Sequence, residues 1–357
     1  MPSREHAVRI ASVATATPPF AMEQQNAGAF LEEHFGARLT PRSRAVLRQV
    51  FAHPSVRNRH FALEDPACLV DEYPDRRVAR FTRWAVDLSE QAARKALSQA
   101  GLGPADVSNL VVNTCTGYLC PGISTYLIER LDLPRDIRAH DLVGSGCGGA
   151  VANLQLAEAV QRQKPGGVTL CISVEICSAT FQMGDDLSLI VSNALFSDGA
   201  AAAVLWDRPG GSFELVAGGS RFAPEHRDAT RYVHRNGQLH NQLSIQLPRI
   251  VREPTAELVR RLLSAHDLRA SDVRHWALHP GGEKVIASLQ EALGLTDAQL
   301  APSRAVLAKH GNISSPTVWF VLRKILDAGV APGDWCMMLA FGAGFSVHGY
   351  LLRATPS

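Results

Sequence analysis

The feature of this sequence that most constrains its fold is an internal repeat. In each half a strand-like segment ends in a glycine-containing loop, NLVVNTCTG over residues 109–117 and HWALHPGG over residues 275–282. Further along each half, a glycine-rich turn opens an amphipathic helix, and a glycine and a second apolar strand follow that helix. The spacing is kept, because 165 residues separate Cys147 from Asn312 and 166 separate Gly167 from Gly333. Two copies of one βαβ-like unit are therefore expected.

Between these landmarks, short β-branched runs alternate with amphipathic helices, which is typical of a mixed α/β fold with much parallel sheet. Strands are expected at residues 110–113, 139–143, 168–174, 200–205, 275–278, 337–341 and 346–352, and helices at 79–100, 149–163, 253–265, 283–293 and 316–328. Loops at the carboxyl ends of such strands form the crevice of the sheet. Two duplicated halves would bring these loops together near their pseudo-twofold axis, and Cys147, His279 and Asn312 all occupy such positions.

Composition narrows the class of protein. At 357 residues, two packed subdomains or one large α/β unit are expected. Lys+Arg total 36 and Asp+Glu 34, so nothing indicates a nucleic-acid partner. No apolar run approaches the roughly 20 residues of a membrane helix, and the first residues lack a secretory signal. The seven cysteines lack the paired spacing of zinc sites, which predicts reduced thiols in a cytoplasmic protein without a metal.

Cys147 is the first candidate for chemistry. It follows the strand-like segment HDLV, lies among Gly144, Gly146, Gly148 and Gly149, and precedes an amphipathic helix. A thiol at a helix N-terminus is stabilised as thiolate by the free amides and the helix dipole. The alternative is a small buried cysteine in a tight turn.

His279 and Asn312 complete a possible constellation. His279 ends an apolar strand before Pro280, and its imidazole could keep Cys147 ionised and bind a thioester oxygen, although it could equally be a packing histidine. Asn312 lies in the turn GNISS, where an asparagine is commonly a helix cap. Its amide would also be a neutral donor for the enolate that forms when a malonyl thioester loses carbon dioxide.

A papain-like protease also combines Cys, His and Asn. Its cysteine lies in a C-G-S-C-[WY] motif near the mature N-terminus, whereas Cys147 lies in GSGCGG, deep within a repeated α/β pattern. The sequence context therefore disfavours a protease.

Several motifs resemble those of the chalcone and stilbene synthases, the type III polyketide synthases of the thiolase fold, over nearly the whole chain. The most specific are Gly146-Cys147, ALFSDGAA at 194–201, WALHPGG at 276–282, GNISS at 311–315 and FGAG at 341–344. The resemblance implies an α/β, thiolase-like fold in which two duplicated halves form α-β-α-β-α layers. Residues 1–207 would form the half with the nucleophilic cysteine, and residues 208–357 the half with the histidine and asparagine.

The same resemblance implies the reaction. Cys147 would accept an acyl starter from CoA, and His279 and Asn312 would assist malonyl-CoA decarboxylation, so that repeated condensation and cyclisation give a polyketide. Phe196, which local sequence alone assigns to the core, would be the gatekeeper of the cavity. No metal or organic cofactor is implied, and a homodimer is expected. A single-round ketoacyl synthase resembling ketoacyl-ACP synthase III is the nearest alternative, and a degenerate binding protein is a third.

Further positions are implied to bind substrate, namely Cys115, Cys120, Glu175, Thr180, Gly237, Ile245, Ser314, Phe341 and Gly342. Cys120 would lie at the dimer interface and line the partner's pocket. Cys115 stands where plant members usually have Thr, in a hydrogen-bonded set with Glu175 and Ser314, and its weaker donor disfavours aldol ring closure. Ile245 in place of a family Phe, with the small Gly237, suggests room for a long or bulky starter.

The sites for the CoA phosphates match the family less closely. Arg48, Arg57 and Arg59 lie in the right region, and guanidinium groups suit phosphate. His53 replaces a lysine of the plant pattern, and each arginine could instead be a solvated surface residue.

Overall fold

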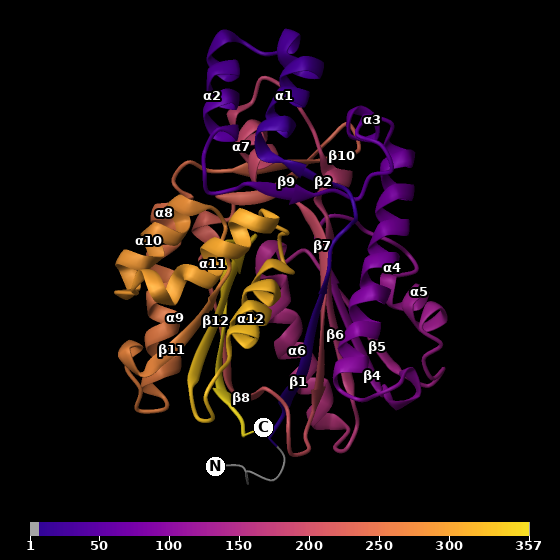
Figure 1. Ribbon diagram of the computed structural model, residues 1–357, viewed down its shortest axis with the longest axis vertical. Helices are drawn as coiled ribbons and strands as arrows, with labels where there is room; N and C mark the ends of the chain where they lie inside the picture. The colour runs from indigo at the N-terminus through magenta and orange to yellow at the C-terminus, as the bar shows by residue number, and fades with distance from the viewer. Residues whose placement is uncertain (1–6, 357) are drawn as a thin grey trace.

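The computed structural model describes residues 7–356, and it confirms the strands expected from the repeat (Figure 1). They are β4 (Asn109–Thr114), β5 (Arg138–Val143), β6 (Thr169–Ile176), β7 (Asp198–Trp206), β11 (Val273–Leu278), β12 (Trp335–Gly342) and β13 (Ser346–Ala354). Two further long strands, β1 (Arg9–Ala16) and β8 (Phe213–Phe222), were not anticipated, nor were the short pairs β2 (Ala21–Glu23) with β3 (Asn58–His60) and β9 (Thr230–Arg235) with β10 (Gln238–Leu243).

The long strands of the described residues join in one hydrogen-bonded order, β11-β12-β13-β8-β1-β7-β6-β4-β5. Strand β4 pairs in parallel with β5 and β6, and β11 pairs in parallel with β12, as expected for repeated βαβ units. The halves meet where β1 pairs with β8, at Arg9–Glu214 and Ile10–Phe213. The predicted boundary at 207/208 lies in the loop between β7 and β8, and it stays a prediction as a domain boundary.

Five layers follow from how the helices pack. Helices α6 (Gly149–Gln163) and α12 (Thr317–Ala328) lie in the middle and contact strands of both halves. On the N-terminal half, α4 (Pro74–Gln99) covers β1, β6 and β7, and α5 (Ile123–Arg130) packs beside it. On the other half, α9 (Arg252–Ser264) and α11 (Asp297–His310) cover the strands, with α10 (Glu283–Leu293) against both helices. The predicted α-β-α-β-α arrangement is therefore confirmed.

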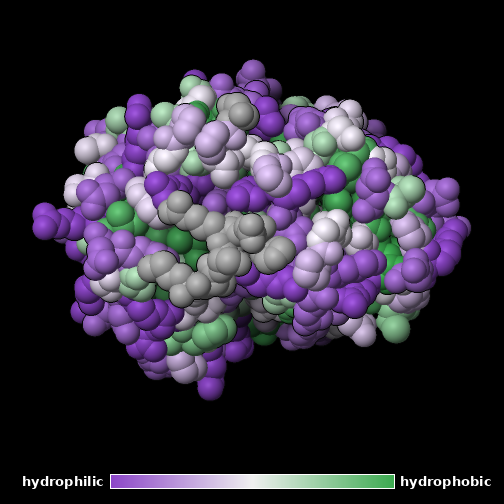
Figure 2. Space-filling model, turned by 90° about the horizontal axis from the view of Figure 1, so that it is seen from below, coloured by the Kyte–Doolittle hydropathy of each residue, from purple (hydrophilic) through white to green (hydrophobic). Residues whose placement is uncertain are grey.

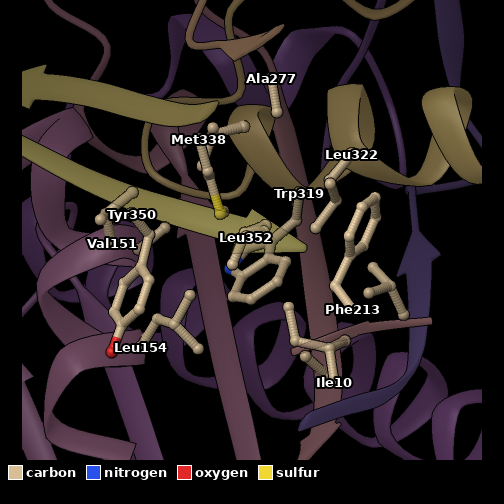
Figure 3. Close-up of a cluster of buried hydrophobic side chains, with 14 of the residues drawn as sticks. Ile10, Val151, Leu154, Phe213, Ala277, Trp319, Leu322, Met338, Tyr350 and Leu352 are labelled. Carbon is tan, nitrogen blue, oxygen red and sulfur yellow. The ribbon is translucent and has the colours of Figure 1, made fainter. Parts of the chain in front are cut away.

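The core between the two sheet halves is built around Trp319 of α12. Its side chain is fully buried among Leu154 of α6, Phe213 of β8 and Tyr350 of β13 (Figure 3). Its indole Nε1 donates a hydrogen bond to Ser173 Oγ at 3.2 Å, so the one polar atom of the ring is satisfied. This apolar core holds the N-termini of α6 and α12 in place.

One end of the molecule carries a smaller helical cluster. It contains α1 (Gln24–Phe35), α2 (Pro41–Phe51) and α7 (Leu187–Leu195), close to the β9–β10 hairpin (Figure 1). Two short helices, α3 (Ala67–Val70) and α8 (Leu247–Ile250), complete the structure described. The opposite end is mainly hydrophilic, with hydrophobic residues in separate groups (Figure 2). Within residues 7–356, no helix is long and apolar enough to cross a membrane.

Candidate active site

Cys147 lies in a 3₁₀ turn, Gly146–Gly148, that runs directly into α6. The loop after β12 packs tightly against this turn. A Cβ on Gly342 would come within 2.6 Å of the Gly148 nitrogen and 3.1 Å of the Cys147 nitrogen, so only glycine fits there. Gly146 has φ +57° and faces Ala343 in the same way. The glycines of the two motifs therefore let the two loops meet at the thiol.

Ser314 connects two of the predicted cysteines. Its Oγ lies 3.3 Å from Cys147 Sγ and 3.4 Å from Cys115 Sγ. The residue has φ +58°, which is uncommon outside glycine and typical of functional sites. Its main-chain N–H donates to Asn312 Oδ1 at 2.8 Å. Cys115, Cys147, Ser314 and Asn312 thus form one continuous group.

Asn312 presents its amide as a donor. Oδ1 accepts from Ser314 N–H and, at 3.4 Å, from Thr317 Oγ1, which fixes the orientation of the carboxamide. No residue of the described chain accepts a hydrogen bond from Nδ2. Asn312 is therefore not the cap of α12, whose N-cap residue is Pro316, and its Oδ1 stabilises the turn while the two N–H groups are left for a substrate oxygen.

His279 follows β11 and is completely buried. Neither ring nitrogen has a hydrogen-bond partner among residues 7–356. The ring packs edge-to-face on Phe341, with centroids 5.2 Å apart. Phe341 is followed directly by Gly342, which abuts the Cys147 turn, so His279 and Cys147 both lie next to the carboxyl end of β12. Buried polar atoms without partners are rare in folded proteins, and here they mark a place for a polar ligand.

Burial shifts the pKa of both the Cys147 thiol and the His279 imidazole. Burial raises the pKa of the Cys147 thiol to about 12, and the hydrogen bond with Ser314 opposes this only in part. Burial also lowers the pKa of His279 to about 3. Desolvation thus opposes ionisation of each group taken alone, whereas the N-terminus of α6 favours the thiolate.

The buried imidazole also makes stability depend on pH. In the unfolded chain His279 takes up a proton below about pH 6.5, whereas the folded chain does so only near pH 3, so its contribution to stability is lost as the pH falls between these values. When the pH is lowered from 6 to 5, the free energy of unfolding should fall by about 1 kcal/mol less in His279→Gln than in the unchanged chain. Urea unfolding at both pH values measures this, and identical losses in the two chains would contradict it.

Glu175 of β6 is fully buried and saturated with hydrogen bonds. Its Oε2 accepts from the N–H and Oγ1 of Thr116 at 3.0 and 2.8 Å, from Cys115 N–H at 2.9 Å and from Thr114 Oγ1 at 3.2 Å. Its Oε1 accepts from Ser315 Oγ. Burial raises the pKa of this carboxyl group. Glu175 thereby holds the Cys115 loop next to the turn that carries Ser314.

Phe196 is joined to the asparagine turn through the main chain. It is the C-cap of α7 and forms an isolated parallel bridge with Asn312. Asn312 N–H donates to Leu195 O at 2.8 Å, and Ser197 N–H donates to Asn312 O at 3.0 Å. The predicted gatekeeper and the predicted amide donor are thus neighbours, although 116 positions separate them in the sequence.

Thr180 leads to a residue that the sequence analysis missed. Its Oγ1 donates to Cys177 O at 3.0 Å and lies 3.2 Å from the hydroxyl of Tyr232 on β9. Burial holds the pKa of Tyr232 well above its usual range, and the nearby Cys177 and Cys115 add to the effect. The Asn236-Gly237 pair is a hairpin-turn signal that could have located these strands, but it does not say which strand residue faces the cysteines.

The structure places three of the predicted contact residues in surroundings other than those expected. Ile245 is 93% exposed, because the chain turns outward between β10 and α8. Gly237 lies at the exposed tip of the β9–β10 hairpin with φ +72°, and an added Cβ there would meet no atom within 4 Å. The turn explains this glycine, and neither residue widens a cavity. Arg59 is only 2% exposed, so it is not a surface ligand for phosphate.

The remaining predicted residues lie where substrate or a partner could reach them. Arg57 is exposed, and Arg48 is an exposed side chain paired with Glu32. Cys120 is exposed as well. The CoA contacts of the two arginines and the place of Cys120 in a partner's pocket stay predictions.

Comparison with known proteins agrees along nearly the whole chain. Residues 46–216 match the family described as FAE1/Type III polyketide synthase-like protein, and residues 214–356 match the C-terminal domain of chalcone and stilbene synthases. A 1,3,6,8-tetrahydroxynaphthalene synthase of Streptomyces peucetius is 33% identical over 96% of this chain and 92% of its own. A 3,5-dihydroxyphenylacetyl-CoA synthase of Streptomyces toyocaensis is 30% identical over 97% and 90%. The crystal structure of PKS-I from the brown algae Ectocarpus siliculosus superposes with a TM-score of 0.90, at 30% identity over 98% of both chains.

Proposed function

Because the chain belongs to the type III polyketide synthase family, we propose that its Cys147, His279 and Asn312 carry out decarboxylating condensation of malonyl-CoA with an acyl chain held on Cys147. The enzyme is an acyltransferase that extends an acyl starter repeatedly and cyclises the product. The observation that supports these roles best is the link from the Cys147 thiol through Ser314 to the oriented Asn312 amide, beside a buried His279 whose unpaired ring packs on Phe341 at the end of β12.

Loading begins at Cys147. His279 takes the proton of the Cys147 thiol as the sulfur attacks the carbonyl carbon of the starter thioester. Neither group ionises easily alone, but the thiolate and imidazolium stabilise each other, so the two titrations are coupled. The tetrahedral intermediate collapses, the carbon–sulfur bond to CoA breaks, and the imidazolium returns its proton to the CoA thiolate.

Extension uses the same groups in another role. Malonyl-CoA loses carbon dioxide, and the electron pair of the broken carbon–carbon bond forms an enolate on the thioester oxygen. Asn312 Nδ2 and the imidazole N–H of His279 stabilise this oxyanion. The enolate carbon then attacks the Cys147 thioester, which releases the Cys147 thiolate and leaves the extended chain on CoA. A half-buried Phe196 next to Asn312 would exclude water from the enolate.

Product analysis by mass spectrometry tests this function. The purified chain is given malonyl-CoA with short, aromatic or long acyl-CoA starters and no carrier protein. We expect multiply extended, cyclised products from at least one starter. A strict need for malonyl carrier protein with one extension would favour the ketoacyl synthase, and no release of carbon dioxide from malonyl-CoA would contradict both.

The cyclisation mode is predicted from Cys115. Its thiol is the group 3.4 Å from Ser314 Oγ, and a thiol is a weaker hydrogen-bond donor than a hydroxyl. We expect pyrones to exceed aldol-derived rings, and Cys115→Thr to raise the share of aldol-derived rings several-fold. Quantifying both classes by chromatography decides this. Cys177→Ser, a matched change at a neighbouring thiol, should leave the ratio unchanged, and resorcinols dominating the unchanged enzyme would contradict the prediction.

Assembly and location also belong to the proposal. Strand β5 ends the sheet, with Val143 49% exposed, and Cys120 is exposed in the loop after the neighbouring β4. An open strand edge with apolar side chains suits pairing with a second copy. A homodimer with Cys120 near the partner's pocket, no cofactor besides the CoA substrates, and a cytoplasmic location stay predictions. Analytical ultracentrifugation measures whether the chain forms the homodimer.

A further inference from the structure

The C-terminal end of α7 lies buried beside the asparagine turn, and its carbonyl groups need partners from outside the helix. Phe196 N–H closes the last turn by donating to Ser192 O at 3.0 Å. The next four carbonyls, those of Asn193, Ala194, Leu195 and Phe196, have no later helical N–H available. Each nevertheless accepts a hydrogen bond.

Three distant segments supply the donors. Arg59 of β3 donates from Nη1 to the carbonyls of Asn193 and Phe196, the latter at 3.0 Å. Gln24, the first residue of α1, donates from Nε2 to Ala194 O at 2.7 Å. Asn312 N–H serves Leu195 O. Arg59 Nε also donates to Gln24 Oε1 at 2.8 Å, so the two side chains form one unit.

The charge of Arg59 is held in an unusual place. The guanidinium group forms no ion pair among the described residues, although Asp198 lies close enough to stabilise its charge. It lies between the rings of Phe51 and Phe61, 5.4 and 4.9 Å from their centroids. The negative end of the α7 dipole stabilises a cation at this position. Burying a cation is costly, so its contacts with α7 account for its place in the fold.

Arg59 touches the asparagine turn from the other side as well. A Cβ on Gly311, the residue before Asn312, would lie 2.9 Å from both Arg59 Cγ and Leu195 O. Any shift of the arginine therefore reaches the main chain of Phe196 through Nη1 and that of Asn312 through Gly311.

We propose that Arg59, together with Gln24, is a positioning residue that fixes the gatekeeper Phe196 and the Asn312 turn for malonyl decarboxylation and condensation. This inference rests on the proposed roles of Phe196 and Asn312. Arg59 does not touch the reacting atoms, and its effect is on the geometry of residues that do.

The test compares Arg59→Met with Arg77→Met. Arg77 is also buried, at 4% exposure, and donates to main-chain carbonyls, those of Asp71 and Phe181, but not to α7. For each variant we would measure the urea midpoint, kcat/KM for malonyl-CoA, and carbon dioxide released per malonyl unit condensed. Arg59→Met is expected to lower kcat/KM about 100-fold and to raise the uncoupled release of carbon dioxide, because a displacement of about 1 Å is enough for that loss. Arg77→Met should lose stability without changing the amount of carbon dioxide released per malonyl unit condensed.

The other outcomes are also decisive. Arg59→Lys keeps the charge and one donor. It should therefore recover part of the coupling between malonyl decarboxylation and condensation that Arg59→Met loses. If Arg59→Met does not fold, Gln24→Leu takes its place, since it removes the hydrogen bonds to Ala194 O and from Arg59 Nε while keeping the arginine. An unchanged ratio of carbon dioxide to product in the Arg59 and Gln24 variants would overturn the inference, whereas an unchanged enzyme that makes no polyketide would overturn the proposed function instead.

Discussion

Cys147→Ala is expected to lower polyketide formation at least 10³-fold, the largest effect of any single change in this chain. Without the thiol there is no covalent acyl-enzyme, and removal of a nucleophile typically costs this much or more. Decarboxylation of malonyl-CoA should continue, because the Asn312 amide and the His279 ring remain in place to stabilise the enolate. Mass spectrometry of the protein should show an added acyl group on the unchanged chain and none on the variant.

Cys171→Ala is the matched control. Burial raises the pKa of the Cys171 thiol to about 12, as it does for Cys147, but Cys171 lies in the middle of β6 and contacts the Asn153 amide. The control thus removes a thiol whose pKa is also raised by burial, but at a position away from the site. The control should keep its activity, and a Cys147→Ala enzyme with more than a few per cent of the unchanged rate would contradict the assignment of the nucleophile.

The fold could be predicted from the sequence where the two halves repeat, because each unit must bury the same apolar strands. Strand β8 was missed because it contains Gly218 and Gly219, which usually weaken a strand. Both are explained by tertiary packing. A Cβ on Gly218 would lie 2.7 Å from the ring of Tyr350, and one on Gly219 would lie 3.2 Å from Leu258. Such close approach between distant segments has no signature in a local pattern.

The residues of the site also divide into those that the sequence could predict and those that it could not. Cys147, His279 and Asn312 were expected together because loops at equivalent repeat positions converge, and the structure joins Cys147 to Asn312 through Ser314. Arg59 could not be placed, since a charged residue in the segment RNRH looks like a surface residue, and only the folded chain brings the carbonyls of α7 and two phenylalanine rings around it. Ile245 was misplaced for the opposite reason, because an apolar residue near a cavity-lining segment can still lie in an exposed turn.

Asn312→Asp should separate enolate stabilisation from covalent catalysis. The carboxylate keeps an acceptor for Ser314 N–H and Thr317 Oγ1, so the turn should retain its shape. It replaces the two N–H donors with an oxygen that repels a developing oxyanion. Loss of one such donor lowers the rate about 10²- to 10³-fold, and we expect at least that loss in both decarboxylation and condensation.

The comparison with Cys147→Ala makes this outcome specific. Cys147→Ala should lose polyketide formation while malonyl-CoA still decarboxylates. Asn312→Asp should lose both reactions while a starter still acylates Cys147. Radiolabelled malonyl-CoA gives the rate of carbon dioxide release, and protein mass spectrometry gives the extent of acylation. If Asn312→Asp decarboxylates malonyl-CoA at the unchanged rate, the amide does not bind the enolate. Its contact with Ser314 would then be purely structural, and His279 alone would have to stabilise the negative charge.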